Sequence, residues 1–454
     1  MMDDIVRWTN QRIGEKTLEW EKSSYYEPTD KVELRALLGL LYLAGVFRNN
    51  HRLLKDFWKT DGTGFEIFRV TMAQRRFEFL LTCLRFDNIE NRAQRREIDR
   101  LAPIRGIIEQ FTENCKNAYS PGQYLTIDEK LESFRGRCQF RQYMPNKPAK
   151  YGIKVQALVD ARTHYLVNME VYVGKQPAGP FALSNTPTAI VERLVSSYDG
   201  THRNITCDNW YTNYDLFEKL RTNHRLTGVG TIRKNKREIP KTFLNARNRS
   251  IKSSLFGFQD GFTILSYVPK KGKVVLLLST LHHDDSVDDS ENKLPEIISF
   301  YNLTKGGVDT VDELSATYSV SRNSRRWPLT LFFSIMNTAG INCQIIHREN
   351  NGGLIMKRKD FLTKLGFELI NDYQKTRMIN FRVPREIRMA LHRIMGETEE
   401  PPAKKQRPDK QRRCDFCPRN RDRKTKYLCE ACEKILCLEH ALMFCEKCGH
   451  FANT

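Results

Sequence analysis

Hydrophobic residues recur at helical spacing over the first 120 residues of the chain, and the period changes after that point. The apolar-rich stretch Val32–Phe47 predicts a helix, and Met72–Arg85 alternates basic and apolar positions at the same spacing. A third helix is predicted over Ile104–Tyr119, and the turn sequence at 120–122 ends the region. Residues 1–120 are therefore predicted to form a helical domain.

Alternation of apolar and polar residues begins at residue 123 and predicts strands separated by helices. On the first strand, Leu125 and Ile127 point to one face and Asp128 points to the other. The predicted strands are 123–130, 152–160, 164–173, 204–208 and 226–232, with helices at 187–198 and 212–222. This order is typical of a mixed sheet flanked by helices.

Short β runs interrupt this pattern after residue 234, and helical signals resume near residue 306. The sequence therefore predicts an α/β fold, with a mixed-sheet core, a β-rich insertion, flanking helical domains and a small cysteine-rich domain. The predicted boundaries are 1–120 and 323–395 for the helical domain, 121–234 and 299–322 for the core, 235–298 for the insertion, 396–413 for a basic linker and 414–454 for the cysteine-rich domain.

Length and charge bound the class of protein. A chain of 454 residues is longer than a single core usually supports, so several domains are expected. The formal net charge of +20 favours a polyanionic partner, nucleic acid before membrane. No apolar run reaches the length that spans a bilayer, so we expect no membrane association.

Three aspartates lie at the ends or centres of predicted elements. Asp128 is on the first strand, Asp208 ends the fourth, and Asp309 begins the helix after the insertion. Converging carboxylates repel each other unless divalent cations neutralise them. Two Mg²⁺ (or Mn²⁺) ions about 4 Å apart would activate a water or a 3′-hydroxyl and stabilise the leaving oxygen of a phosphodiester displacement. The alternative is that Asp208 merely ends a strand and Asp309 merely caps a helix.

The tail carries the clearest metal signal. Seven of the 12 cysteines lie after residue 413 in closely spaced pairs, which is typical of zinc thiolates in a reducing compartment. With one histidine they supply ligands for two tetrahedral Zn²⁺ ions. The four-residue spacers are too short for sequential fingers, which favours cross-bracing. The predicted sites are Cys414, Cys417, Cys437 and His440 for one ion, and Cys429, Cys432, Cys445 and Cys448 for the other.

The linker before this tail is rich in basic residues, including Lys404-Lys405 and Arg412-Arg413. Such runs are typical of nuclear-import signals, so we expect the protein in the nucleus. A merely solvated linker is the alternative.

Six motifs in a fixed order resemble those of piggyBac-type transposases. They are LTIDE (125–129), FRGRCQFRQYMPNKPAKYGIK (134–154), NITCDNW (204–210), GTIRKNKREIP (230–240), YNLTKGGVDTVDEL (301–314) and RRWP (325–328). The resemblance extends from about Ile5 to the terminal cysteines. One departure is at the front, where family members generally carry a long acidic arm and this chain starts almost directly in the helical region.

The resemblance implies a ribonuclease-H-like core with an insertion domain, and it implies that Asp128, Asp208 and Asp309 are a catalytic triad. Asp312 matches a fourth functionally important acid of the family. Arg233 and Lys236 match positions that contact DNA, and Trp327 matches a tryptophan near the transferred strand.

Trp210 is a further candidate because it follows Asp208 by two residues. Its indole could stack on an unpaired base or wall the metal site. An ordinary core aromatic is the alternative.

The activity implied by the resemblance is cut-and-paste transposition of double-stranded DNA. The enzyme would excise a transposon through hairpin intermediates and join it to TTAA targets, and its cysteine-rich domain would recognise the terminal repeats. Because the two transposon ends must be held together, at least a homodimer is expected. The helical segments 1–120 and 328–395 are expected to form its interface.

Two alternatives belong to other classes of protein. The chain could be a domesticated, catalytically silent DNA-binding protein, although retention of all three aspartates favours an enzyme. The cysteine-rich tail could instead be a RING-like or PHD-like module that binds proteins.

Overall fold

The computed structural model describes residues 1–19, 26–48, 53–289, 291–380, 382–396, 410–429 and 434–441. The chain divides into two compact units. The first comprises 1–52 and 75–369, and the second comprises 53–74 and 370–454. The α/β fold class predicted from the sequence is confirmed.

A mixed sheet forms the centre of the first unit. Its strands are β1 (Tyr124–Ser133), β2 (Arg141–Tyr143), β3 (Tyr151–Asp160), β4 (Leu166–Val171), β5 (Asn204–Cys207), β6 (Thr227–Thr231), β7 (Ser254–Gln259), β8 (Phe262–Lys270) and β9 (Lys273–Ser279). They are hydrogen-bonded in the order β2-β3-β1-β5-β6-β9-β8-β7, with β4 paired to β3. The pairs β1–β5 and β5–β6 are parallel, and the other pairs are antiparallel.

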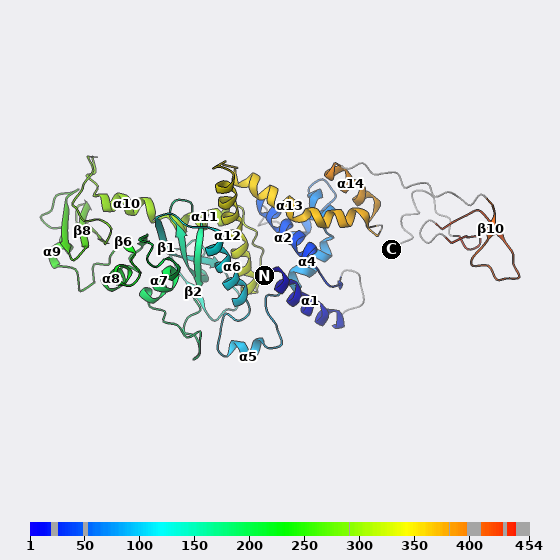
Figure 1. The fold of residues 1–454 in the computed structure, drawn as a ribbon, viewed down its shortest axis with the longest axis horizontal. Helices are drawn as coiled ribbons and strands as arrows, with labels where there is room; N and C mark the ends of the chain where they lie inside the picture. Colours follow the sequence, from blue (N-terminus) through cyan, green and yellow to red (C-terminus); the bar gives the residue numbers. More distant parts are fainter. Residues whose placement is uncertain are drawn as a thin grey trace. The chain divides into compact units, whose positions relative to one another are not determined.

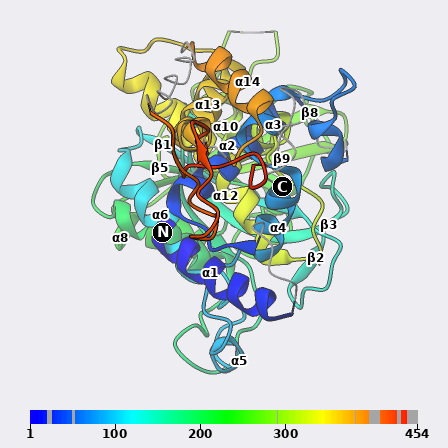
Figure 2. The same ribbon diagram turned by 90° about the vertical axis from the view of Figure 1, so that its right-hand side faces the viewer.

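Helices cover both faces of this sheet. In Figure 1, α10 and α11 lie above the strands, and α7 and α8 lie below them. The short helix α5 lies at one edge of the unit in both views (Figures 1 and 2). The helical segments are α1 (Met2–Glu19), α2 (Lys31–Val46), α4 (Gln74–Cys83), α5 (Arg92–Arg96), α6 (Arg105–Ala118), α7 (Pro187–Val195), η3 (Ser196–Tyr198), α8 (Tyr214–Thr222), α9 (Lys241–Leu244), α10 (Glu296–Thr304), α11 (Gly307–Thr317), α12 (Trp327–Asn350) and the first part of α13 (Arg358–Ile379).

The segment predicted as an insertion contains β7, β8 and β9. These strands continue the main sheet, because β9 pairs with β6 and aligns Val229 with Ser279. A further bond, from the Gly228 backbone N–H to Thr280 Oγ1 at 2.8 Å, fixes the same junction. Periodicity along the chain identifies such strands but not their partners, because the pairing joins segments some 50 residues apart.

Helices α2, α12 and the first part of α13 pack closely against one another in the first unit. The Tyr42 hydroxyl on α2 donates to the Met336 carbonyl on α12 at 2.7 Å. A Cβ on Gly340 would lie 3.0 Å from Leu362 Cδ2 and 3.2 Å from Tyr42 Cε1, so the glycine permits the close approach.

By length and composition α12 could cross a membrane, but 72% of its most apolar window is buried, as expected for a core helix.

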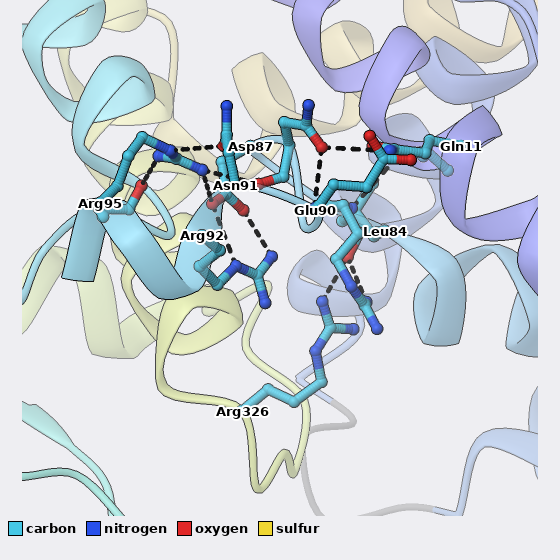
Figure 3. A network of polar contacts seen from close by, with 12 residues as sticks. Gln11, Leu84, Asp87, Glu90, Asn91, Arg92, Arg95 and Arg326 are labelled. Atoms are coloured by element: carbon cyan, nitrogen blue, oxygen red, sulfur yellow. Dashed lines mark hydrogen bonds and ion pairs between the residues drawn. The ribbon is translucent and has the colours of Figure 1, made fainter. Parts of the chain in front are cut away.

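Arg326, in the RRWP motif, joins the start of α12 to the end of α4 (Figure 3). Its Nη1 donates to the Leu81 and Thr82 carbonyls, both at 3.1 Å, and its Nη2 donates to the Leu84 carbonyl. Burial and the neighbouring Arg85 lower the pKa of Arg326 to about 9. The guanidinium satisfies the terminal carbonyls of α4, where the helix dipole favours a cation.

The second unit has its own apolar cluster. Val70 packs there with residues of the last part of α13 and of α14 (Arg385–Met395), among them Met378, Ile387 and Leu391. Ion pairs join α3 (Glu66–Thr71) to α14, from Arg69 to Glu386 at 3.0 Å and from Arg393 to Glu66 at 2.6 Å. The other elements of the unit are η2 (Leu54–Trp58), β10 (Arg412–Arg413) and β11 (Lys424–Thr425).

Candidate active site

Parallel pairing of β1 with β5 brings two of the predicted aspartates to one edge of the sheet. The register aligns Ile127 with Cys207. Asp128 and Asp208 are the next residues along the two strands, so their side chains leave the same end of the pair. Both side chains are half-buried.

Buried threonines on the same two strands position the third aspartate. Thr126 Oγ1 donates to the Thr304 carbonyl at 2.5 Å, and Thr206 Oγ1 donates to Thr304 Oγ1 at 2.8 Å. Thr304 is the last residue of α10. These bonds fix the chain above the strands immediately before α11 begins.

Gly307 then allows α11 to approach β1. A Cβ at this position would meet Thr126 Oγ1 at 3.0 Å, which is tighter than almost all such contacts. Because no side chain intervenes, Asp309 in the first turn of α11 reaches the edge where Asp128 and Asp208 lie.

All three aspartates line one cavity of about 180 Å³. The remaining wall comes from Tyr301, Lys305, Gly306 and residues of β1 and β5. The structure therefore brings the three predicted residues together, as the order of the elements indicated. Their catalytic role stays a prediction.

Backbone hydrogen bonds hold two of the carboxylates in place. Asp128 Oδ1 accepts from the Glu129 N–H at 2.7 Å, and Asp208 Oδ1 accepts from the Trp210 N–H at 2.8 Å. Burial, reinforced by the Glu129 carboxylate, raises the pKa of Asp128 to about 7, and burial also raises the pKa of Asp208. The fold thus disfavours the charged forms unless a cation is present.

The donor set fits hard divalent cations. Carboxylate oxygens are the ligands that Mg²⁺ prefers, and Mg²⁺ keeps several of its waters. Clustered carboxylates with raised pKa values are typical of a metal-binding site that lacks its bound cation. Asp128, Asp208 and Asp309 are the residues that would hold such ions.

One lysine reaches this site from a neighbouring hairpin. Lys147 Nζ lies 3.3 Å from Asp309 Oδ1. Burial opposes its charge, but Asp128 and Asp309 together raise the pKa of Lys147. Lys147 was not among the predicted site residues, although its place between two prolines in MPNKPAK is a signal of a rigidly presented side chain.

Asp312 lies one turn beyond Asp309 and does not line the cavity. Its Oδ1 is 3.5 Å from Nζ of Lys130, a fully buried lysine on β1. Lys130 Nζ also lies 3.3 Å from Glu132 Oε1. Burial, opposed by Lys130, raises the pKa of Asp312 to about 6. This ion pair connects α11 to β1, one turn beyond Asp309. A catalytic role for Asp312 stays a prediction.

The candidate DNA-contacting residues after β5 lie beside the cavity. Trp210 packs edge-on against Tyr211, and Lys154 Nζ lies 4.1 Å from the centroid of the Trp210 ring. Trp210 is half-buried and does not line the cavity. Arg233 is exposed, donates from Nε to Asn209 Oδ1 at 3.0 Å, and opposes the rise in the pKa of Asp208 that burial causes.

Two further candidates occupy rigid positions. Lys236 is half-buried in a turn in which its N–H donates to the Arg233 carbonyl at 3.2 Å. Trp327 is the first residue of α12, and its ring packs edge-on against Phe140 at 5.0 Å between centroids. Phe140 lies in the same FRGRCQFRQY motif that leads into β2, so two motifs meet at this tryptophan.

The first predicted zinc set is assembled in the second unit. The ligand atoms of Cys414, Cys417, Cys437 and His440 all lie within 4.8 Å of one another, and no other such group occurs among the described residues.

Distances within this cluster fit a tetrahedral zinc ion. His440 Nδ1 lies 3.2 Å from Cys437 Sγ and 3.6 Å from Cys414 Sγ, and the sulfurs of Cys417 and Cys437 are 3.6 Å apart. Ligands bound at the usual Zn–S and Zn–N lengths are separated by about 3.6–3.8 Å. The pairing of 414/417 with 437/440 is the one that cross-bracing requires.

The second predicted set lies mostly outside the described residues. Cys429 is described, whereas Cys432, Cys445 and Cys448 are not. Most of the predicted nuclear-import segment, at 397–409, is likewise outside them.

A family model described as Transposase IS4 matches residues 1–344 of the chain. PiggyBac transposable element-derived protein 3 of Homo sapiens is 24% identical over 326 residues, which are 67% of this chain and 53% of the relative. PiggyBac transposable element-derived protein 2 of Homo sapiens is 22% identical over 347 residues, 72% of this chain and 57% of the relative. The chain thus spans about half the length of these curated relatives.

Among solved structures, the chain is similar to piggyBac transposase in a cryo-EM structure of its synaptic complex with hairpin DNA. The two are 36% identical and superimpose with a TM-score of 0.82. The match covers 98% of this chain and 94% of the other.

Proposed function

This chain belongs to the piggyBac-type transposase family, and on that premise we propose that it is an active cut-and-paste DNA transposase. It would excise a transposon through hairpin intermediates and integrate it at TTAA sites. The observation that carries this proposal is the convergence of Asp128, Asp208 and Asp309 on one cavity.

The chain's residues would prepare this cavity for phosphodiester chemistry. Two Mg²⁺ or Mn²⁺ ions bound there would activate the attacking oxygen and neutralise the leaving oxygen. Backbone bonds orient Asp128 and Asp208, and Thr126 and Thr206 hold the segment that carries Asp309. Positioning of this kind supplies much of the rate enhancement in phosphoryl transfer.

Four transfers would follow at each transposon end. Water first attacks the phosphodiester at the 3′ end and leaves a free 3′-hydroxyl. That hydroxyl attacks the opposite strand, which releases the donor DNA and closes a hairpin on the transposon end. A second water opens the hairpin, and the restored 3′-hydroxyl attacks a phosphodiester of the TTAA target.

DNA is the partner that the charge supports. The chain carries 74 Lys and Arg against 54 Asp and Glu. Exposed Arg233 lies beside Asp208, where a phosphate approaching the site would pass. We propose that Lys236, Trp210 and Trp327 extend this contact, that the cysteine-rich domain reads the terminal repeats, and that binding weakens steeply with salt.

Assembly and location complete the proposal. Because the two ends of one element must be cut together, the active species would be a homodimer or a larger homo-oligomer. The solved piggyBac transposase to which the chain is similar forms a synaptic complex with hairpin DNA, which supports this assembly. We propose that the protein acts in the nucleus, directed there by the basic segment 396–413.

Strand-resolved cleavage in vitro tests this function. Full-length protein is incubated with duplexes that carry the inverted repeat and a flanking TTAA, labelled on either strand. With Mg²⁺ we expect a 3′ nick followed by a hairpin product, and without added divalent ion neither product.

A catalytically silent DNA-binding descendant gives a different result. It would bind the same duplexes specifically and cleave neither strand in Mg²⁺ or Mn²⁺. That outcome would overturn the enzymatic proposal and leave the family assignment intact.

A further inference from the structure

Lys147 is presented to the aspartates by a short, rigid hairpin loop. The loop joins β2 to β3 and is braced by bonds from the Met144 N–H to the Lys150 carbonyl at 2.8 Å and from the Lys150 N–H to the Lys147 carbonyl at 3.0 Å. Pro145 and Pro148 flank the lysine and restrict the backbone further. The position of the ammonium group is therefore built into the fold.

This ammonium group makes the one ion pair that the described residues offer to the three aspartates. Lys147 Nζ lies 3.3 Å from Asp309 Oδ1, and the lysine side chain is only 18% exposed. Other nearby cations have different partners: Lys305 donates to Asn302 Oδ1 at 2.8 Å, and Lys154 pairs with Glu129 at 3.7 Å.

The charge on Lys147 acts beyond Asp309. It opposes the rise in pKa that burial causes at Asp128, and it does the same at Asp312. Its ammonium group thus lies within electrostatic range of carboxylates on both β1 and α11. A single positive charge among these acids supplies part of the neutralisation that divalent ions would supply fully.

We propose that Lys147 is the counter-ion of Asp309 in the metal-free active site. Its ion pair with Asp309 would break when a divalent ion binds to that carboxylate. Lys147 is in this sense a positioning residue that acts through Asp309. The inference rests on the proposed use of divalent ions at the three aspartates.

Two consequences follow for the metal-free and the metal-bound protein. Without metal, Lys147 stabilises the fold by reducing repulsion among the aspartates. With metal, its charge repels the ion and its ion pair is lost, so it weakens metal binding. A purely structural lysine would stabilise both states equally.

Replacing Lys147 by methionine distinguishes the proposed counter-ion role from a purely structural role, because methionine keeps a similar length and removes the charge. Full-length zinc-loaded protein without DNA is titrated with Ca²⁺, which serves as a non-cleaving probe, and its thermal unfolding and binding isotherm are recorded. We expect K147M to unfold at a lower temperature than wild type without Ca²⁺, to lose that difference at saturating Ca²⁺, and to bind Ca²⁺ about tenfold more tightly.

Two further variants control the experiment. Lys150→Met makes the same change in the same loop at an exposed position for which the structure gives no ion pair, so both curves should match wild type. In an Asp309→Asn background, Lys147→Met should no longer change Ca²⁺ affinity, because the two residues act as one unit.

Two results would overturn the inference. If K147M is destabilised equally with and without Ca²⁺, or binds Ca²⁺ no more tightly than wild type, Lys147 is structural. If wild type binds no divalent ion and Asp128→Asn changes nothing, the proposed metal chemistry itself fails, and the inference fails with it.

Discussion

Alanine at Asp128, Asp208 or Asp309 is expected to reduce DNA strand cleavage and joining at least about a thousandfold, a loss of about 4 kcal/mol of transition-state stabilisation. Each residue contributes one wall of the same cavity, so loss of any one carboxylate removes ligands that no neighbour replaces. Binding of transposon ends should change little, because the proposed end-binding domain is in the other compact unit.

Folding should survive the substitutions at Asp128 and Asp208. Burial raises the pKa of both Asp128 and Asp208, which means that their charges destabilise the metal-free fold. The stability that the protonated forms provide at low pH is lost as pH rises toward the raised pKa, near 7 for Asp128. An uncharged replacement of Asp128 or Asp208 should therefore be at least as stable as wild type at pH 8 without added divalent ion.

Asp215→Ala is a matched control for these variants. Asp215 lies exposed in the first turn of α8, and its carboxylate pairs with Lys219, four residues later, at 3.2 Å. Its cleavage rate should equal that of wild type. Wild-type cleavage by any one of the three active-site variants would remove that residue from the proposed triad.

Removal of zinc should have the second largest effect. Among the described residues after 413 few side chains are buried, and three of these are Cys414, Cys417 and Cys437. Such a segment depends on metal for its fold, and structural zinc contributes on the order of 10 kcal/mol. Elemental analysis should find two zinc ions per chain. Chelation should unfold the segment after residue 413 and lower end-specific binding at least about tenfold.

Cys417→Ser should remove one zinc ion and reproduce most of this loss. Cys343→Ser is the matched control, because Cys343 is an exposed cysteine on α12 far from the cluster in sequence. One zinc ion in the wild-type chain would contradict the cross-braced arrangement. End binding that persists without zinc would favour a RING-like or PHD-like role for the domain.

Local pattern was sufficient to predict the elements that carry the aspartates. Apolar alternation around Asp128 and the apolar run before Asp208 identified β1 and β5, and short Cys-x₂-Cys and Cys-x₂-His spacings identified the first metal cluster. These features depend on neighbours within a few residues. The convergence of all three aspartates needed the resemblance to known motifs as well.

Contacts between distant segments could not be predicted in the same way. Lys130 was visible as a lysine in an apolar strand, but its partner Asp312 follows 182 residues later, on a helix packed across β1. Lys147 meets Asp309 only because the β2–β3 loop turns toward α11. The pairing of β9 with β6 likewise depends on tertiary packing, which alternation along one strand does not encode.

Sequencing of donor junctions after excision in cells tests the central claim most directly. A transposon whose ends leave as hairpins, with TTAA overhangs at the donor, should leave one intact TTAA at every repaired junction. This outcome is predicted for the wild type and should disappear in the Asp128, Asp208 and Asp309 variants. Small insertions or deletions in place of TTAA, or no excision by the wild type, would contradict the account.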